Sequence, residues 1–227
     1  MSPCRKTIKQ MNKIRCAIFD FDGTVADTKY SVMDSARHAL KHFGIDESEE
    51  ALRRFIGPTL WYSFSTYYGI KDKDCDEAVR IYREYYAAEG IKKARLYDGI
   101  EDAVNGLKAL GIETAVATVR EENSLLQNFS VLGINGLFDA YAGSLANGER
   151  SDKAELIAVA LERLHVPEAV DAVVIGDSRT DCEGANAIGC GFIAALYDRD
   201  ISEFEGLDIG MKAYAPLDLV SIISGLI

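Results

Sequence analysis

The stretch CAIFDFDGTVADT, residues 16–28, decides the fold. The apolar run before Asp20 is typical of a buried strand in a parallel sheet. Open α/β sheets bind ligands at the carboxyl ends of their strands, and this strand ends at Asp20 and Asp22. Extended backbone places both carboxylates on the same side of the chain. Because buried like charges repel one another, the pair predicts a bound cation, and oxygen ligands favour Mg²⁺.

After residue 94, predicted strands alternate with predicted helices. Each predicted helix carries apolar residues at helical spacing, as in the segment from Ile100 to Leu110, and several end at a glycine. This alternation predicts an α/β fold with a doubly wound, Rossmann-like parallel sheet. The expected strands cover residues 113–118, 138–142, 171–176 and 191–195, with a short edge strand near Ala213.

Between the first strand and this alternating region, residues 27–94 contain several predicted helices. Asp27 or Thr28 is expected to cap the first of them, and Ser48 the second. The sequence therefore predicts a catalytic core formed by residues 1–26 and 95–227, with a helical cap domain, residues 27–94, inserted after the first strand.

Further polar residues follow the later strands or begin the later helices. Thr118 ends the strand 113–118 and Val119 follows it, and a hydroxyl and backbone N–H groups there can hold a phosphoryl oxygen. Lys153 begins a helix, where a cation opposes the helix dipole unless it has a partner such as Asp20. A solvated lysine is the alternative for that position, and Arg150 is a possible substitute for it.

Two acidic residues belong to the same set. Asp177 follows the strand 171–176 and is expected to complete the Mg²⁺ site. Asp181 can bind the metal directly, bind it through water, or cap the helix that follows.

These motifs, in this order, resemble those of the haloacid dehalogenase superfamily. The segment Asp20-Phe21-Asp22-Gly23-Thr24, with Val-Ala-Asp-Thr after it, is similar to the first motif of the phosphoglycolate-phosphatase-like group. Thr118 and Lys153 match the second and third motifs, and the G-D-x-x-x-D pattern of residues 176–181 matches the fourth. Val119-Arg120 departs from the family, because close relatives often have a small polar residue and then Lys at these two positions.

The resemblance implies a role for each matching residue. Asp20 would be the nucleophile that forms an aspartyl-phosphate, and Asp22 the general acid and base. Thr118, the backbone N–H of Val119 and Lys153 would hold the phosphate. Mg²⁺ would be bound by Asp20, the backbone carbonyl of Asp22, Asp177 and Asp181.

The expected function is therefore Mg²⁺-dependent hydrolysis of a small phosphate monoester. Phosphoglycolate is the first expected substrate, and a nucleoside monophosphate is another. One alternative is a phosphosugar mutase of the same fold. Another is a non-catalytic phospho-binding or signalling module, although such a module needs no inserted cap.

The composition of the 227 residues agrees with this interpretation. A net charge of −11 without a basic patch argues against nucleic-acid binding, so the expected partner is a small phosphorylated metabolite. No apolar run has the length of a membrane helix, and the polar segment 1–13 does not look like a signal peptide. Five scattered cysteines without a CxxC motif indicate a reducing, cytoplasmic location. No feature of the sequence predicts an oligomeric state.

Overall fold

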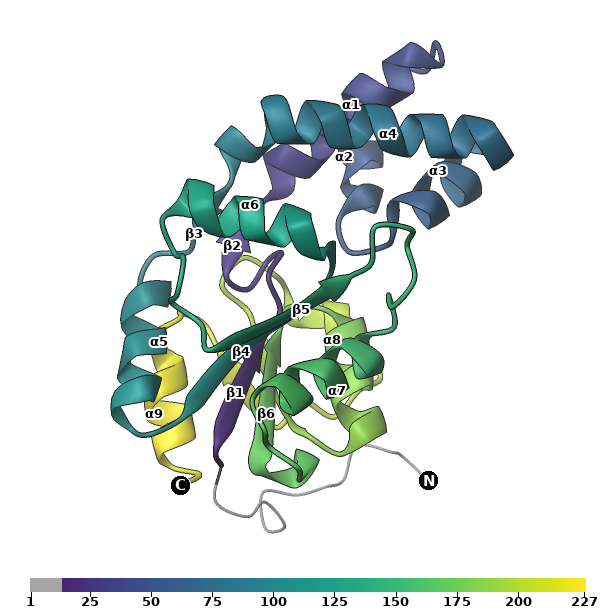
Figure 1. The fold of residues 1–227 in the computed structure, drawn as a ribbon. Coiled ribbons are helices and arrows are strands. Elements are labelled where there is room, and N and C mark those ends of the chain that lie inside the picture. Colours follow the sequence, from purple (N-terminus) through teal and green to yellow (C-terminus); the bar gives the residue numbers. More distant parts are fainter. Residues whose placement is uncertain (1–13) are drawn as a thin grey trace.

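The computed structural model describes residues 14–227, and the expected N-terminal extension, residues 1–13, lies outside the described part. A six-stranded sheet of parallel strands, in the order β5-β4-β1-β6-β7-β8, forms the centre of the molecule (Figure 1). This arrangement confirms the expected α/β class. The strands are β1 (Cys16–Phe19), β4 (Glu113–Glu121), β5 (Ala140–Ser144), β6 (Ala172–Gly176), β7 (Gly191–Ala195) and β8 (Met211–Ala213).

Strand β1 lies at the middle of the sheet, paired with β4 on one side and β6 on the other. The order of strands runs away from β1 in both directions, so the carboxyl end of β1 is the topological switch point where such sheets bind ligands. Both faces of β1 are buried, with Ala17 and Phe19 in one apolar cluster and Cys16 and Ile18 in the other. This explains why the strand reads as a continuous apolar run instead of an alternating one.

Helices cover both faces of the sheet (Figure 1). On the face of Phe19 lie α5 (Ile100–Ala109), α6 (Glu122–Leu132) and α9 (Asp218–Ser224). On the face of Ile18 lie α7 (Lys153–Arg163) and α8 (Arg179–Ile188). Within residues 14–227, none of the helices combines the length and the apolar character needed to cross a membrane.

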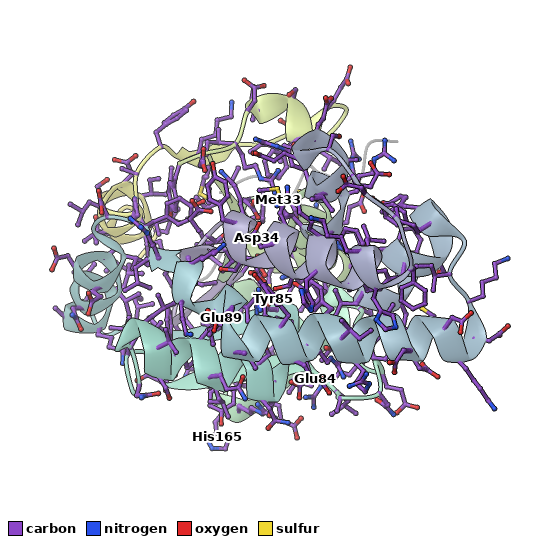
Figure 2. The ribbon with its side chains drawn as sticks, turned by 90° about the horizontal axis from the view of Figure 1, so that it is seen from above. Met33, Asp34, Glu84, Tyr85, Glu89 and His165 are labelled. Carbon is purple, nitrogen blue, oxygen red and sulfur yellow. The ribbon has the colours of Figure 1, made fainter. Side chains whose placement is uncertain are left out.

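The helices formed by residues 29–93 make up a separate layer above the sheet (Figure 1). We call residues 29–93 the helical segment, and it has an apolar cluster of its own. Figure 2 shows its two long helices side by side, with Asp34 on one and Tyr85 on the other. Stacking of His38 on Tyr85, with ring centroids 4.3 Å apart, holds these two helices together. The segment contains α1 (Lys29–His42), α2 (Glu49–Leu52), α3 (Leu60–Tyr68) and α4 (Asp72–Ala88).

Two short strands connect the helical segment to the core. The first, β2 (Ala26–Asp27), pairs antiparallel with β3 (Arg95–Leu96), so the chain leaves and re-enters the core at the same place. This pair could not be predicted from the sequence, since strands of two residues carry no hydrophobic periodicity.

Two further details differ from the expectations. Of the two residues expected to cap α1, Asp27 accepts a hydrogen bond from the backbone N–H of Lys29 at 3.1 Å, whereas the side chain of Thr28 does not cap the helix and donates instead to Asp22. Strand β4 runs on to Glu121 instead of ending at Thr118, because it pairs with Ser144 of β5 after a shift in register. Thr118 therefore lies inside a strand, next to an irregularity, and not at a strand end.

Candidate active site

Three buried aspartates meet at the carboxyl end of the central strands. Asp20 directly follows β1, Asp177 directly follows β6, and Asp181 lies in the first turn of α8. One carboxylate oxygen from each of the three residues lies within 4.8 Å of the corresponding oxygens of the other two. We call these residues the acidic cluster. Burial raises the pKa of Asp20 well above its usual value, and it raises the pKa of Asp177 to about 6. The negative charges of the neighbouring aspartates raise both pKa values further.

Asp181 has two functions in this arrangement. Its Oδ2 accepts hydrogen bonds from the backbone N–H and the hydroxyl of Ser178, which closes a capping box at the start of α8. Its Oδ1 lies 2.7 Å from the Nζ of Lys153. The residue therefore caps the helix and faces the cluster at the same time.

Lys153 supplies a positive charge to the acidic cluster. Its Nζ donates to Oδ1 of Asp20 at 2.6 Å and to the carbonyl oxygen of Ala117 at 2.8 Å. The lysine is only 7% exposed, so the solvated alternative for this position is wrong. Burial opposes its charged form, but the neighbouring carboxylates of Asp181 and Asp20 outweigh it and raise the pKa of Lys153. The lysine therefore stays protonated within the cluster.

The residues around the acidic cluster suit a small, hard cation. Gly23 makes room for the cluster, because a Cβ atom at that position would lie 2.1 Å from Oδ2 of Asp177. Asp177 also accepts a hydrogen bond from Nε of Arg199 at 2.7 Å. Three carboxylates face two cations, Lys153 and Arg199, so an added dianionic phosphate would increase an existing excess of negative charge. Oxygen ligands with this charge fit Mg²⁺.

The side chain of Asp22 does not belong to the acidic cluster. Its carboxylate is held instead by Arg120, with Nη2 2.5 Å from Oδ1 and Nε 3.1 Å from Oδ2, and by the hydroxyl of Thr28. Asp22 was expected to contribute its backbone carbonyl to a metal site, and its side chain is not among the three carboxylates of the acidic cluster.

Thr118 and Val119 lie beside the acidic cluster. The Thr118 side chain is fully buried, and its Oγ1 accepts a hydrogen bond from the backbone N–H of Arg120 at 3.2 Å. Both residues line a cavity of about 500 Å³ that also reaches Asp20, Asp22 and Lys153. The structure thus places all of the expected phosphate-binding residues at one cavity.

The helical segment lines the same cavity from the opposite side. Its contribution is mostly apolar and aromatic, and it includes Gly57, Pro58 and Thr59. Arg54 of the same segment is not part of this lining, and its guanidinium lies over the Tyr67 ring, 5.8 Å from the centroid. The other lining residues of the segment include Phe55, Ile56, Leu60, Trp61, Tyr82, Arg83 and Tyr86.

One candidate from the sequence lies away from the site. Arg150, considered as a substitute for Lys153, pairs instead with Glu122 at 2.9 Å and donates to the carbonyl oxygen of Gly143. Conversely, the contacts of Arg199 with Asp177 and of Thr28 with Asp22 were not predicted from the sequence. Arg199 follows β7, the neighbour of β6, so its place at the carboxyl edge of the sheet was the available signal.

The raised pKa of Asp177 predicts how stability depends on pH without metal. Between pH 3.8, the usual value, and about 6, folded Asp177 keeps a proton that the unfolded chain has lost. Its contribution is therefore fully present below about pH 4 and is lost as the pH rises through about 6. In EDTA, we expect the free energy of unfolding of the wild type, minus that of Asp177→Asn, to decrease over this range by on the order of 3 kcal/mol. Urea unfolding at several pH values measures this difference, and a constant difference would contradict the prediction.

Comparison with known proteins places this arrangement in a family. The model of the haloacid dehalogenase-like hydrolases matches residues 17–195, which include the acidic cluster, Asp22, Thr118 and Lys153. A solved structure described as a predicted phosphatase from Clostridium acetobutylicum is 29% identical, with a TM-score of 0.87, and covers 94% of this chain and 100% of that one.

Characterised relatives carry several names. The tyrosine-protein kinase PtkA of Mycobacterium tuberculosis is 34% identical over 76% of this chain, but the match spans only 58% of that protein's length. A 5′-nucleotidase of Pseudomonas aeruginosa is 33% identical over 79% of this chain and 81% of that protein. A phosphoglycolate phosphatase of Mesorhizobium japonicum is 28% identical, with 83% and 86% covered. The chain belongs to the haloacid dehalogenase-like hydrolases.

Proposed function

We propose that this protein is a Mg²⁺-dependent phosphatase that hydrolyses small phosphate monoesters through an aspartyl-phosphate on Asp20. The observation that carries the proposal is the position of Asp20. It lies at the switch point of the sheet, bonded to Lys153, next to two further carboxylates and open to a cavity of about 500 Å³. The phosphatase names among its relatives support the same reaction class.

The reaction has two steps. In the first, a carboxylate oxygen of Asp20 attacks phosphorus, the bond to the ester oxygen breaks, and Asp22 gives a proton to the leaving alcohol. In the second, Asp22 takes a proton from a water molecule that attacks phosphorus, and the bond to Asp20 breaks. Free phosphate leaves, and both aspartates return to their initial states.

The surrounding residues would stabilise the charge that these steps involve. Lys153 and the backbone N–H groups near Thr118 and Val119 would bind the phosphoryl oxygens. Asp20, Asp177, Asp181 and the backbone carbonyl of Asp22 would hold Mg²⁺, which when bound screens the repulsion between the Asp20 carboxylate and the phosphate dianion.

The helical segment would act as the cap domain expected for residues 27–94. It forms the opposite wall of the cavity, so it would exclude bulk water and select the leaving group. Phosphoglycolate is the first substrate to test. A nucleoside monophosphate is the second, because Trp61 in the wall is only partly buried and offers aromatic surface for a base.

The test is phosphate release from a panel of small phosphomonoesters, in Mg²⁺ and in EDTA. We expect release from a narrow set of esters in Mg²⁺ and none in EDTA. Isomerised sugar phosphate without free phosphate would indicate the phosphosugar mutase instead. Tight Mg²⁺ binding with no turnover of any ester would indicate the phospho-binding or signalling module.

The Mg²⁺ requirement leads to a prediction for Asp177. In Asp177→Asn, one buried carboxylate of the acidic cluster becomes neutral, so we expect the Mg²⁺ concentration for half-maximal activity to rise at least about 10-fold. Mg²⁺ titration of phosphate release measures it. Asp102→Asn, an exposed position on α5, is the matched control, and an unchanged Mg²⁺ requirement in Asp177→Asn would rule that carboxylate out as a ligand.

A further inference from the structure

Arg120 is placed where its guanidinium can act on Asp22. Nη2 lies 2.5 Å from Oδ1 and Nε lies 3.1 Å from Oδ2, so the contact is bidentate. The two side chains are 9% and 16% exposed. Bidentate pairs of this kind fix the orientation of the carboxylate as well as its charge. In this arrangement Asp22 is an oriented carboxylate, which is the form that a general base needs.

The remaining contacts of Arg120 leave little of it to bind a phosphate. Its Nη1 donates to Oγ of Ser124 at 3.4 Å. Its central carbon lies 4.8 Å from the ring centroid of Tyr86 and 5.7 Å from that of Phe21. Each of its three nitrogens thus has a protein partner, and two aromatic rings contact the guanidinium. These contacts favour a role through Asp22 over direct binding of substrate.

Tyr86 connects this ion pair to the helical segment. It belongs to α4, is 3% exposed, and its hydroxyl donates to Oδ1 of Asn128 on α6 of the core at 2.9 Å. The ring that packs on Arg120 is therefore fixed between the helical segment and the core. The position of α4 consequently influences the position of Arg120, and through it that of Asp22.

We propose that Arg120 is a positioning residue that holds Asp22 as an oriented base for hydrolysis of the aspartyl-phosphate, and that Tyr86 supports it from the helical segment. The proposal rests on the proposed function above. It assigns Arg120 mainly to the second step, in which ionised Asp22 removes a proton from water. The first step depends much less on Arg120 when the leaving group departs without needing a proton.

The test uses p-nitrophenyl phosphate in Mg²⁺, since p-nitrophenolate departs without protonation. In Arg120→Gln we expect kcat to fall about 100-fold, because general base catalysis contributes about 10² to 10⁴. KM should fall by a similar factor. The ratio kcat/KM should therefore change less than about 3-fold, because it depends only on the steps up to and including the loss of p-nitrophenolate. Rapid mixing should show a burst of p-nitrophenolate equal to the enzyme concentration, because the aspartyl-phosphate accumulates.

Four further variants complete the design. Arg120→Lys keeps the charge without the bidentate contact, so we expect it to restore part of kcat. Tyr86→Leu removes the ring and should lower kcat about 10-fold with the same pattern, and Tyr86→Phe, which keeps the ring, should lower it less. Arg80→Gln is the matched control, since Arg80 lies on the exposed side of α4 and pairs with Glu77 and Glu84.

The outcomes separate the two proposals. Mg²⁺-dependent turnover by the wild type tests the phosphatase function by itself. If kcat/KM then falls together with kcat in Arg120→Gln and no burst appears, Arg120 binds phosphate or supports the fold, and the positioning role is overturned. No turnover by the wild type would overturn both proposals.

Discussion

Replacing Asp20 by Asn is expected to lower phosphate release by about 10⁴-fold or more. An amide has neither the charge nor the nucleophilic oxygen that forms the aspartyl-phosphate, and loss of a nucleophile removes most of an enzyme's rate enhancement. The substitution barely changes the volume of the side chain. The loss would therefore be chemical, and phosphate release from the best ester of the panel measures it.

We expect the fold of Asp20→Asn to remain intact. Lys153 keeps its contacts with Asp181, at 2.7 Å, and with the carbonyl oxygen of Ala117, at 2.8 Å. Burial already raises the pKa of Asp20, so removing its charge relieves a cost in the absence of metal. In EDTA, the thermal midpoint should equal or exceed that of the wild type. Asp102→Asn is again the control, and normal turnover by Asp20→Asn would refute covalent catalysis at this residue.

Much of the core could be predicted because its elements carry strong local signals. Strand β7 matches the expected range 191–195, and α5 buries Ile100, Ala103, Val104 and Leu107 as its helical spacing indicates. The connecting pair β2–β3 and the extension of β4 to Glu121 depend on contacts between distant segments. No local pattern records such contacts, so these elements could not be predicted.

The candidate site also contains residues whose positions could be predicted and contacts that could not. Asp20 and Asp177 follow apolar strands directly, and parallel strands bring their carboxyl ends to one edge, so their meeting could be predicted. The partners of these residues could not. That Arg199, after β7, pairs with Asp177, and Arg120, inside β4, with Asp22, depends on the direction that long, flexible side chains take.

Replacing Lys153 by Met is expected to have the largest effect on stability. Methionine keeps the length of the side chain but removes its charge, which leaves Asp20, Asp177 and Asp181 buried together without the lysine. Breaking a buried ion pair from one side costs about 3–5 kcal/mol, because the remaining charge stays buried and unpaired. In EDTA at neutral pH, we expect the free energy of unfolding to fall by about this amount, as measured by urea unfolding. Activity should fall by at least about 100-fold.

Three comparisons isolate the charge as the cause. Lys108→Met is the matched control, because Lys108 pairs with Asp139 at 2.9 Å on the surface, where such a pair is worth about 1 kcal/mol or less. Adding Asp20→Asn to Lys153→Met removes one of the repelling carboxylates, so the double variant should be more stable than Lys153→Met alone. Saturating Mg²⁺ should likewise restore part of the stability of Lys153→Met, since a cation bound by the acidic cluster replaces the missing positive charge. Equal stability of Lys153→Met and the wild type in EDTA would mean that the cluster tolerates its charges without the lysine, and the electrostatic account of the site would then be wrong.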